Sequence, residues 1–179
     1  HTFHDTFKRF PGYGSADADG KPLLSWRVQI LPYLGHQDLF ERFRLDEPWD
    51  SEHNRQLIAE MPTVYAAVGS RLLQRDGMTN FRVPGGPASM FPDLVGTSFR
   101  DILDGSSYTI AILEVDDDHA VEWTRPESFE VDTENPLIGL GGHSRDRWSF
   151  ARADGSVSFH PMDFPADRLR ALLTPNGRD

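Results

Sequence analysis

The chain has 179 residues and no cysteine. The absence of cysteine excludes disulfide bonds, thiolate nucleophiles and cysteine-based zinc sites, although it does not choose a cellular compartment. Long apolar runs are missing too. No stretch reaches the roughly 18 residues that a membrane-spanning helix needs, and no signal peptide is visible. His1 is therefore either a processed N-terminus or the edge of a piece of a longer protein.

Basic residues are few. Lys and Arg number 18 against 28 Asp and Glu, which gives a formal net charge of −10. Nucleic acids and anionic membranes attract basic surfaces, so neither is predicted as a partner. Cation binding and simple solubility are both compatible with this charge. With 38% hydrophobic residues, including 12 Phe and 4 Trp, the chain has enough apolar bulk for a single domain over residues 1–179.

The motifs of common enzymes are also missing. The sequence contains no G-x-S-x-G, H-E-x-x-H or G-K-S/T pattern. Gly139–His143 departs by one position from a dinucleotide-binding loop, and no helical pattern follows it. Without cysteine, a hydrolase would need Ser or Thr activated by a His, and no nucleophile elbow is present. We therefore predict a non-catalytic domain. An enzyme remains a third hypothesis, supported only by His143 and scattered carboxylates.

An aromatic stripe lies at the start of the sequence. Phe3, Phe7 and Phe10 share one face of a 3.6-residue helical wheel, and Pro11 with Gly12 ends the pattern. No N-cap residue precedes the stripe, so the helix is expected to continue upstream in the natural protein. We predict that these three rings hold the end of a longer helix against a β-sheet.

The hydrophobic pattern is helical early in the chain and β-like afterwards. A polar, glycine-rich loop is predicted at residues 12–22, and helical segments at 25–34, 37–43 and about 50–61, the last capped by Asp50 or Ser51. Strands are predicted at 63–68, 80–83, 107–115 and 120–124, of which the last two form a hairpin. This order predicts an α+β fold with an antiparallel sheet and additional short helices. The last predicted element is a helix at 166–173 whose inward residues are Leu169, Leu172 and Leu173.

A second hairpin is more clearly specified. Trp148 and Phe150 alternate with small residues on the way out, and Val157 and Phe159 alternate on the way back. The Asp-Gly pair at 154–155 lies between them. Such a pair is typical of a two-residue type I′ turn, in which both residues need positive φ angles.

Several segments, in order along nearly the whole chain, carry a resemblance to one family. They are His1–Pro11, Leu24–Leu34, Leu45–Ser51, Asp104–Ile110, Glu122–Pro126 and Ala153–Val157. In these segments the chain resembles a bacterial prepilin-like family of unknown function, named for a C-terminal motif of His, nine residues and Asp-Gly (H-x9-DG).

The resemblance implies a pilin-like fold, in which the soluble end of a long helix packs on an antiparallel sheet, as in type IV pilins and type II secretion pseudopilins. It also implies an extracytoplasmic location, in the periplasm or at the cell surface. Membrane anchoring would go through an N-terminal hydrophobic helix that this sequence lacks. The partners that it implies are other proteins or like subunits of an envelope assembly.

The family motif corresponds to His143, Asp154 and Gly155, but ten residues rather than nine separate the histidine from the aspartate. As an extended strand these residues would span roughly 30 Å. The two ends could meet only if the chain folds back between Gly141 and Arg147. We therefore interpret Asp154 and Gly155 as a turn and His143 as a loop residue, rather than as one catalytic or metal site.

His1, His4 and Asp5 are candidate ligands of a transition metal. They lie on the helix face opposite the phenylalanines, at a spacing that can hold zinc or copper. The alternative is an ordinary solvated face.

Calcium is the other candidate ion. Asp17 and Asp19 imitate the start of a calcium loop, but the twelfth position counted from Asp17 is Val28, so an EF-hand is excluded. A less regular calcium site is still a hypothesis, either at these two residues or at a second acidic run. The alternative interpretation of that run is a solvated hairpin tip. The run consists of Asp116, Asp117 and Asp118, with Glu114 and Glu122 nearby.

Two further hypotheses of function are therefore kept in addition to the enzyme hypothesis. The favoured hypothesis is a structural or interaction domain of a pilin- or pseudopilin-like protein, without a cofactor. The second is an extracytoplasmic ligand-binding module for a divalent metal or a carbohydrate, in which exposed tryptophans would stack on sugar rings. The tryptophans lie in apolar patterns or beside proline, which favours core packing instead; they are Trp26, Trp49, Trp123 and Trp148.

Overall fold

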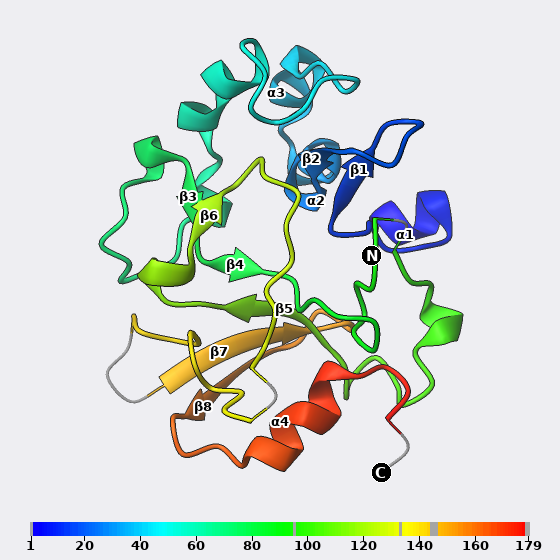
Figure 1. The fold of residues 1–179 in the computed structure, drawn as a ribbon, viewed down its shortest axis with the longest axis vertical. Helices are drawn as coiled ribbons and strands as arrows, with labels where there is room; N and C mark the ends of the chain where they lie inside the picture. Colours follow the sequence, from blue (N-terminus) through cyan, green and yellow to red (C-terminus); the bar gives the residue numbers. More distant parts are fainter. Residues whose placement is uncertain (1, 95, 133, 144–146, 178–179) are drawn as a thin grey trace.

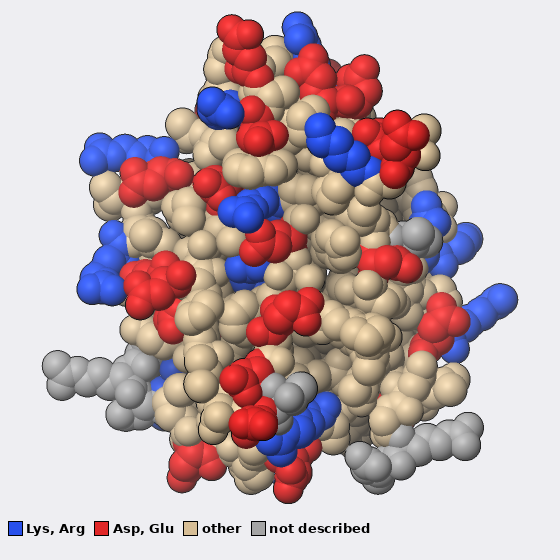
Figure 2. Space-filling model, viewed as in Figure 1, with Lys and Arg blue, Asp and Glu red and all other residues tan. Residues whose placement is uncertain are grey.

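The structure is a computed structural model that describes residues 2–94, 96–132, 134–143 and 147–177. It confirms the α+β class with antiparallel sheets. The upper half in Figure 1 holds short helices and two small sheets, and the lower half holds the largest sheet with the C-terminal helix against it. No described helix is long and apolar enough to cross a bilayer. Acidic and basic side chains are intermixed on the face shown in Figure 2.

The elements follow one another in this order. The first half contains α1 (Thr2–Phe7), β1 (Gly14–Ala16), β2 (Pro22–Ser25), α2 (Trp26–Gln29), η1 (Leu31–Leu34), α3 (Gln37–Arg42), η2 (Asn54–Glu60), η3 (Thr63–Tyr65), η4 (Gln74–Asp76), β3 (Met78–Thr79) and β4 (Phe81–Arg82), where η denotes a 3₁₀-helix. The second half contains η5 (Phe99–Asp101), β5 (Ile110–Glu114), η6 (Asp117–His119), β6 (Val121–Glu122), β7 (Arg147–Arg152), β8 (Val157–Pro161) and α4 (Ala166–Leu173).

Three antiparallel sheets organise these strands. β1 pairs with β2, β3 pairs with β6, and the largest sheet has the order β4-β5-β7-β8. Since side chains alternate across a strand, each strand of the large sheet contributes to two faces. One face carries Trp148, Phe150 and Leu113 into a core with Leu169 of α4, and all four are nearly completely buried. The other face lies toward the upper half of the molecule.

The local helical predictions at residues 25–43 are confirmed, although the helices are short. Ser25 caps α2 by accepting a hydrogen bond from the N–H of Arg27, and Pro32 lies at the start of η1, where proline is tolerated. Neither Asp50 nor Ser51 is the N-cap of the element that follows, which is the 3₁₀-helix η2 with His53 at that position. Ser51 does accept a hydrogen bond from the N–H of Asn54.

The N-terminal helix differs from its prediction. It ends at Phe7 because Lys8 takes a positive φ of 61°, so Phe10 does not continue the same helical face. Phe7 is 52% exposed, and Phe3 contacts Tyr33 of η1. The expected clamp of three rings on the sheet is therefore wrong. Only Phe10, which follows the helix, enters a core that Ile112 of β5 also contacts.

Three other local predictions are also wrong. Residues 63–68 do not form a strand, since residues 63–65 are the 3₁₀-helix η3. The predicted loop at 12–22 contains β1 and begins β2. β5 and β6 follow one another but do not pair, because β6 pairs with β3 and β5 lies between β4 and β7.

The β7–β8 hairpin and α4 are confirmed, but the hairpin turn is of another type. Gly155 donates its N–H to the carbonyl of Arg152, and the N–H of Arg152 donates to Ser156. Gly155 has a φ of 87°, whereas no positive φ occurs at Asp154. This is a three-residue loop with one left-handed residue, rather than the two-residue type I′ turn.

The turn geometry predicts that substitutions at Asp154 and Gly155 have different effects on stability. Gly155→Ala is expected to lower the free energy of unfolding by about 1 kcal/mol, because a Cβ is disfavoured at this φ. Asp154→Ala should cost less, since it removes only the hydrogen bond that the carboxylate accepts from the N–H of Ser156. Urea unfolding of the two variants measures the difference. Equal losses, or a larger loss at Asp154, would contradict the assigned turn.

Candidate functional site

A groove of about 870 Å³ separates the upper half of the molecule from the second face of the large sheet. Its floor runs across the sheet and includes Ile112 of β5 and Ala151 of β7, which are partners in the ladder. Trp26 of α2 and Tyr65 of η3 form part of the opposite wall. The lining is mainly apolar, but one end is polar. Glu114, His143 and Ser149 lie there.

His143 is the centre of this polar end. Its Nδ1 lies 2.9 Å from Glu114 Oε1, and its Nε2 lies 2.9 Å from Asp117 Oδ1. The other oxygen of Glu114 accepts a hydrogen bond from the hydroxyl of Ser149. The side chain of His143 is only 5% exposed, and the two carboxylates are 16% and 11% exposed. Ionised carboxylates only accept hydrogen bonds, so the geometry is satisfied when both ring nitrogens carry protons.

Glycines bring His143 to this position. Asp116 donates its N–H to the carbonyl of Gly139, and Gly141 donates its N–H to the carbonyl of Glu114. The segment before His143 therefore runs back along the end of β5. Gly141 and Gly142 have φ angles of 76° and 95°, which residues with a Cβ rarely adopt. The glycine-rich stretch that resembles a dinucleotide loop thus serves to fold the chain back.

Asp117 is held by more groups than His143 alone. Its Oδ1 accepts hydrogen bonds from the hydroxyl of Ser70 at 2.6 Å and the amide of Asn80 at 3.1 Å. Its Oδ2 accepts one from the N–H of Arg71 at 3.0 Å. Burial by itself would raise the pKa of Asp117. The hydrogen bonds from Ser70, His143, Arg71 and Asn80 outweigh that effect and hold the pKa well below its usual range.

This lowered pKa makes stability depend on pH in a defined direction. A carboxylate whose pKa is depressed by folding stabilises the protein above its unfolded pKa of about 3.9 and loses that contribution as pH falls toward the folded value. Asp117→Asn is expected to cost about 2 kcal/mol at pH 7. The difference from the wild type should stay constant down to about pH 5 and shrink below about pH 4.

Urea unfolding at a series of pH values measures this difference. Asp118→Asn is the control, because Asp118 is exposed beside Asp117 and accepts no hydrogen bond from a described residue. It should follow the wild type at every pH. A gap between Asp117→Asn and the wild type that is independent of pH down to pH 2 would contradict the assigned role.

The arrangement lacks the geometry of nucleophilic catalysis. In a serine hydrolase the hydroxyl donates to a ring nitrogen of histidine, which then takes the proton. Here the hydroxyl of Ser149 donates to Glu114, and both ring nitrogens of His143 lie against carboxylates. A general base needs a free lone pair within reach of a substrate, and this histidine offers none in the described geometry.

The predicted family motif is divided by the structure. His143 precedes β7 and Asp154 follows it, so the strand separates them. Asp154 is exposed at the hairpin turn, where its carboxylate accepts a hydrogen bond from the N–H of Ser156. The backbone that precedes His143 runs along the end of β5, and this brings His143 to the end of that strand rather than to Asp154.

The predicted metal ligands are only partly within the described residues. His1 lies outside the described residues. His4 contacts the ring of Phe99 at a centroid distance of 4.4 Å and accepts from its N–H, whereas Asp5 is exposed. Within the described ranges, no group of three or more histidine and carboxylate side chains is arranged to hold a metal. Around His143 the two carboxylates bind opposite ring nitrogens and so share no common point with the ring.

The calcium candidates are engaged locally. Asp17 closes the β1–β2 turn by accepting hydrogen bonds from the N–H groups of Asp19 and Lys21. Asp116 caps η6 by accepting from the N–H of His119, and it also contacts the ring of that residue. Asp118 is exposed, as expected for a solvated tip. Asp117, by contrast, points into the His143 cluster. Binding of calcium or a transition metal stays a prediction.

Three of the four tryptophans are in the core. Trp26 is 5% exposed, Trp148 1% and Trp123 0%. Trp49 is half-buried, with the guanidinium of Arg125 5.7 Å from its ring centroid. These positions agree with core packing rather than with a row of rings open to a sugar.

Sequence reasoning did not connect His143 with its cluster. Glu114 contacts the ring, Ser149 bonds to Glu114, and Ser70 and Asn80 bond to Asp117. These four residues have no recognisable spacing relative to the histidine, because they lie 29, 6, 73 and 63 positions away. One signal was available. Glu114 interrupts the nearly continuous apolar run of the clearest strand. A charge in such a place predicts a buried partner.

The fold and site define an α+β domain with antiparallel sheets and a buried histidine–carboxylate cluster at the end of an apolar groove. The chain belongs to the family described as "Protein of unknown function (DUF1559)", whose model matches residues 1–88 and 65–137. The His143 loop and the β7–β8 hairpin lie beyond the matched residues. No curated protein and no solved structure matches the chain.

Proposed function

We propose that the chain is a non-catalytic, extracytoplasmic interaction domain of a pilin- or pseudopilin-like protein. The placement rests on the resemblance of segments along nearly the whole chain to a prepilin-like family, and on the order of helices before strands. Membership of a family of unknown function is compatible with it.

One observation carries the non-catalytic part of the proposal. Both nitrogens of His143 lie 2.9 Å from carboxylate oxygens, and Ser149 donates to the same Glu114 that holds the ring. The cluster therefore joins the end of β5, the start of η6 and β7 to one another. A buried polar network in which every member is satisfied rigidifies the elements that it connects.

The interaction part rests on the lips of the groove. Large apolar side chains stand exposed on both sides of it, and contiguous apolar surface of this kind marks contact sites in soluble proteins. On the upper lip Leu34, Val64 and Val68 are 40%, 54% and 95% exposed. On the lower lip Val157 and Phe159 are 59% and 67% exposed.

The proposal is tested on the full-length protein in its native cells, with an epitope tag at the C-terminus. We expect the upstream reading frame to encode a prepilin leader and about 20 apolar residues. We also expect the tag to be cleaved by protease added to intact cells or, for a periplasmic domain, only after the outer membrane is opened. A tag that stays in the cytoplasmic fraction, protected in both cases, would overturn the proposal.

A further inference from the structure

We infer that the free edge of β8, together with the groove beside it, accepts an extended segment of a different polypeptide, which adds to the large sheet as a further strand. This inference rests on the proposed interaction role and names the kind of partner that the groove takes. β8 is the last strand of the order β4-β5-β7-β8, so one of its edges has no strand beside it. Addition of a strand to such an edge is a recurrent mode of peptide recognition.

The register of β8 decides which backbone groups are free. The N–H of Arg152 donates to the carbonyl of Ser156, which makes these two residues a hydrogen-bonded pair. Such pairs alternate along an antiparallel ladder, so the backbone groups of Ser158 face β7, whereas those of Val157 and Phe159 point away from it. No described residue outside the hairpin bonds to the backbone of Val157 or Phe159. These N–H and C=O groups are available to an added strand.

The same two residues carry the exposed side chains of the lower lip. Val157 and Phe159 share the groove face with their ladder partners Ala151 and Ser149, which are small. A strand beside β8 would therefore place alternate side chains over this platform and into the groove. Exposed β-branched and aromatic residues on an unpaired edge are otherwise a liability that soluble proteins avoid. Their presence here favours a partner that covers them.

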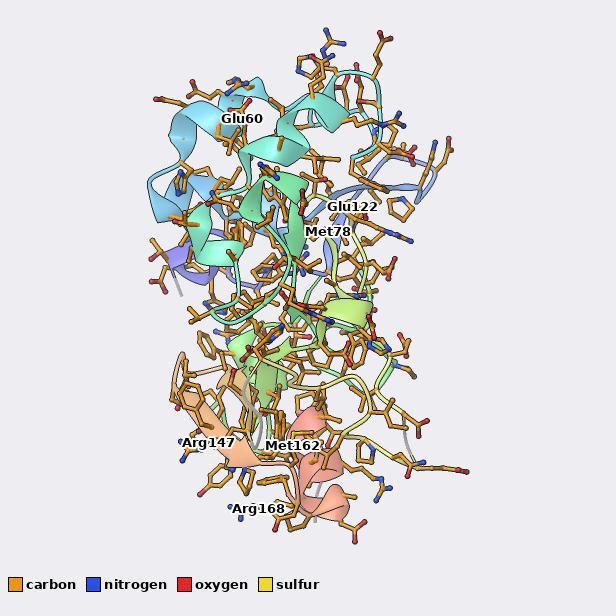
Figure 3. All side chains as sticks on the ribbon, turned by 90° about the vertical axis from the view of Figure 1, so that its left-hand side faces the viewer. Glu60, Met78, Glu122, Arg147, Met162 and Arg168 are labelled. Carbon is orange, nitrogen blue, oxygen red and sulfur yellow. The ribbon has the colours of Figure 1, made fainter. Side chains whose placement is uncertain are left out.

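Charge indicates what that partner carries. Arg147 is the ladder partner of Pro161, so it stands at one end of the platform, and it is exposed. Figure 3 places it in the lower half of the molecule, far from Glu60 and Glu122. None of the ion pairs between described residues involves Arg147. An acidic residue near one end of the added segment complements it.

A second copy of this chain fits the edge less well. Asp154 precedes β8 and Asp163 follows it, and both are exposed. Antiparallel pairing of β8 with itself about a two-fold axis at Phe159 would bring Asp154 of one copy beside Asp163 of the other, twice. Like charges so placed oppose association, as does the net charge of −10 on each copy. The structure thus favours a different chain as the occupant.

The probe for the test is a synthetic seven-residue peptide in which valine alternates with threonine and a glutamate stands near one end. One control peptide has lysine in place of glutamate. A second control carries N-methyl groups on the alternate amides that would bond to β8, which removes the hydrogen bonds and keeps the side chains. NMR titration of the intact chain, up to about 1 mM peptide, follows the backbone amides of Val157 and Phe159.

We expect the glutamate peptide to shift these two amides and to slow their hydrogen exchange. The lysine and N-methylated peptides should bind at least about tenfold more weakly. Phe159→Ser should weaken binding about tenfold, whereas Leu103→Ser, which removes an equally exposed apolar side chain outside the groove, should not. Arg147→Glu should reverse the preference between the glutamate and lysine peptides. Circular dichroism establishes that each variant is folded.

Three results would overturn the inference. One is the absence of any shift at Val157 and Phe159. Another is equal binding of the N-methylated peptide, which means that the groove takes apolar chains without strand addition. The third is protection of the two amides that grows with protein concentration alone, which means that a second copy occupies the edge. The cellular location of the tagged protein is measured separately, so failure of strand addition leaves the proposed extracytoplasmic placement intact.

Discussion

Replacement of His143 by alanine is expected to lower the free energy of unfolding by about 3 kcal/mol at pH 7, because it leaves two largely buried carboxylates without their shared partner. For a domain of this size the loss corresponds to a decrease of roughly 6–12 °C in the melting temperature. Chemical unfolding followed by circular dichroism measures both quantities. His36→Ala is the matched control, since His36 begins α3 without a side-chain capping bond.

Coupling within the cluster distinguishes the loss of hydrogen bonds to the carboxylates from the creation of a simple cavity. If the penalty comes from uncompensated carboxylates, Asp117→Asn should cost less in the His143→Ala background than in the wild type. Additive losses in the double variant would contradict the role of His143 as the hydrogen-bond partner of Asp117. A loss below about 1 kcal/mol for His143→Ala alone would contradict it as well.

Trp123→Ala is expected to lower the free energy of unfolding by about 4 kcal/mol. The side chain is 0% exposed and lies between Tyr65 and Phe43, at centroid distances of 5.8 and 5.6 Å. Its indole N–H donates to the carbonyl of Ile58 at 2.9 Å, and this buried acceptor would lose its partner. The predicted loss therefore combines a cavity with an unsatisfied polar group.

The measurement is again the free energy of unfolding, with Trp49→Ala as the matched control. Trp49 is half-buried at the rim of the same core cluster, so its truncation should cost roughly 1–2 kcal/mol. Trp123→Phe should recover part of the loss by filling the cavity without supplying the N–H. Equal costs for the two tryptophans would show that the upper core does not depend on Trp123.

Elements whose pattern is local could be predicted from the sequence. The β7–β8 hairpin and α4 are examples, because their alternation and periodicity arise within short segments that also pair or pack with their neighbours in sequence. The detail of the hairpin turn could not be predicted, since an Asp-Gly pair suits both a two-residue and a three-residue loop. The structure chooses the loop in which only Gly155 has a positive φ.

Predictions that depended on distant partners were less successful. β5 and β6 are adjacent in sequence and both β-like, but β6 pairs with β3 while β7 takes the place beside β5. Residues 63–68 are β-branched, aromatic or small, which favours a strand. Tyr65 is nevertheless turned into the core, where its hydroxyl donates a hydrogen bond to the carbonyl of Arg27. Tertiary packing outweighs strand propensity there.

The candidate site depends even more on contacts between residues that are distant in the sequence. His143 could be identified as a residue of interest from the sequence, but its interpretation as an ordinary loop residue missed the contacts with Glu114 and Asp117. Those contacts depend on the backward run of the glycine segment along β5, which no local pattern specifies. The site is therefore a product of the fold, and a single sequence contains its members without their arrangement.

The central claim is that His143 is a structural clamp whose two ring nitrogens are both engaged by carboxylates. Nitrogen NMR of the imidazole ring in the wild-type protein at pH 7 tests it most directly. We expect the ring N–H protons of His143 to exchange with solvent much more slowly than those of the exposed histidines, because the ring is buried between two carboxylates. Ring protons of His143 that exchange as fast as those of the exposed histidines would contradict this claim.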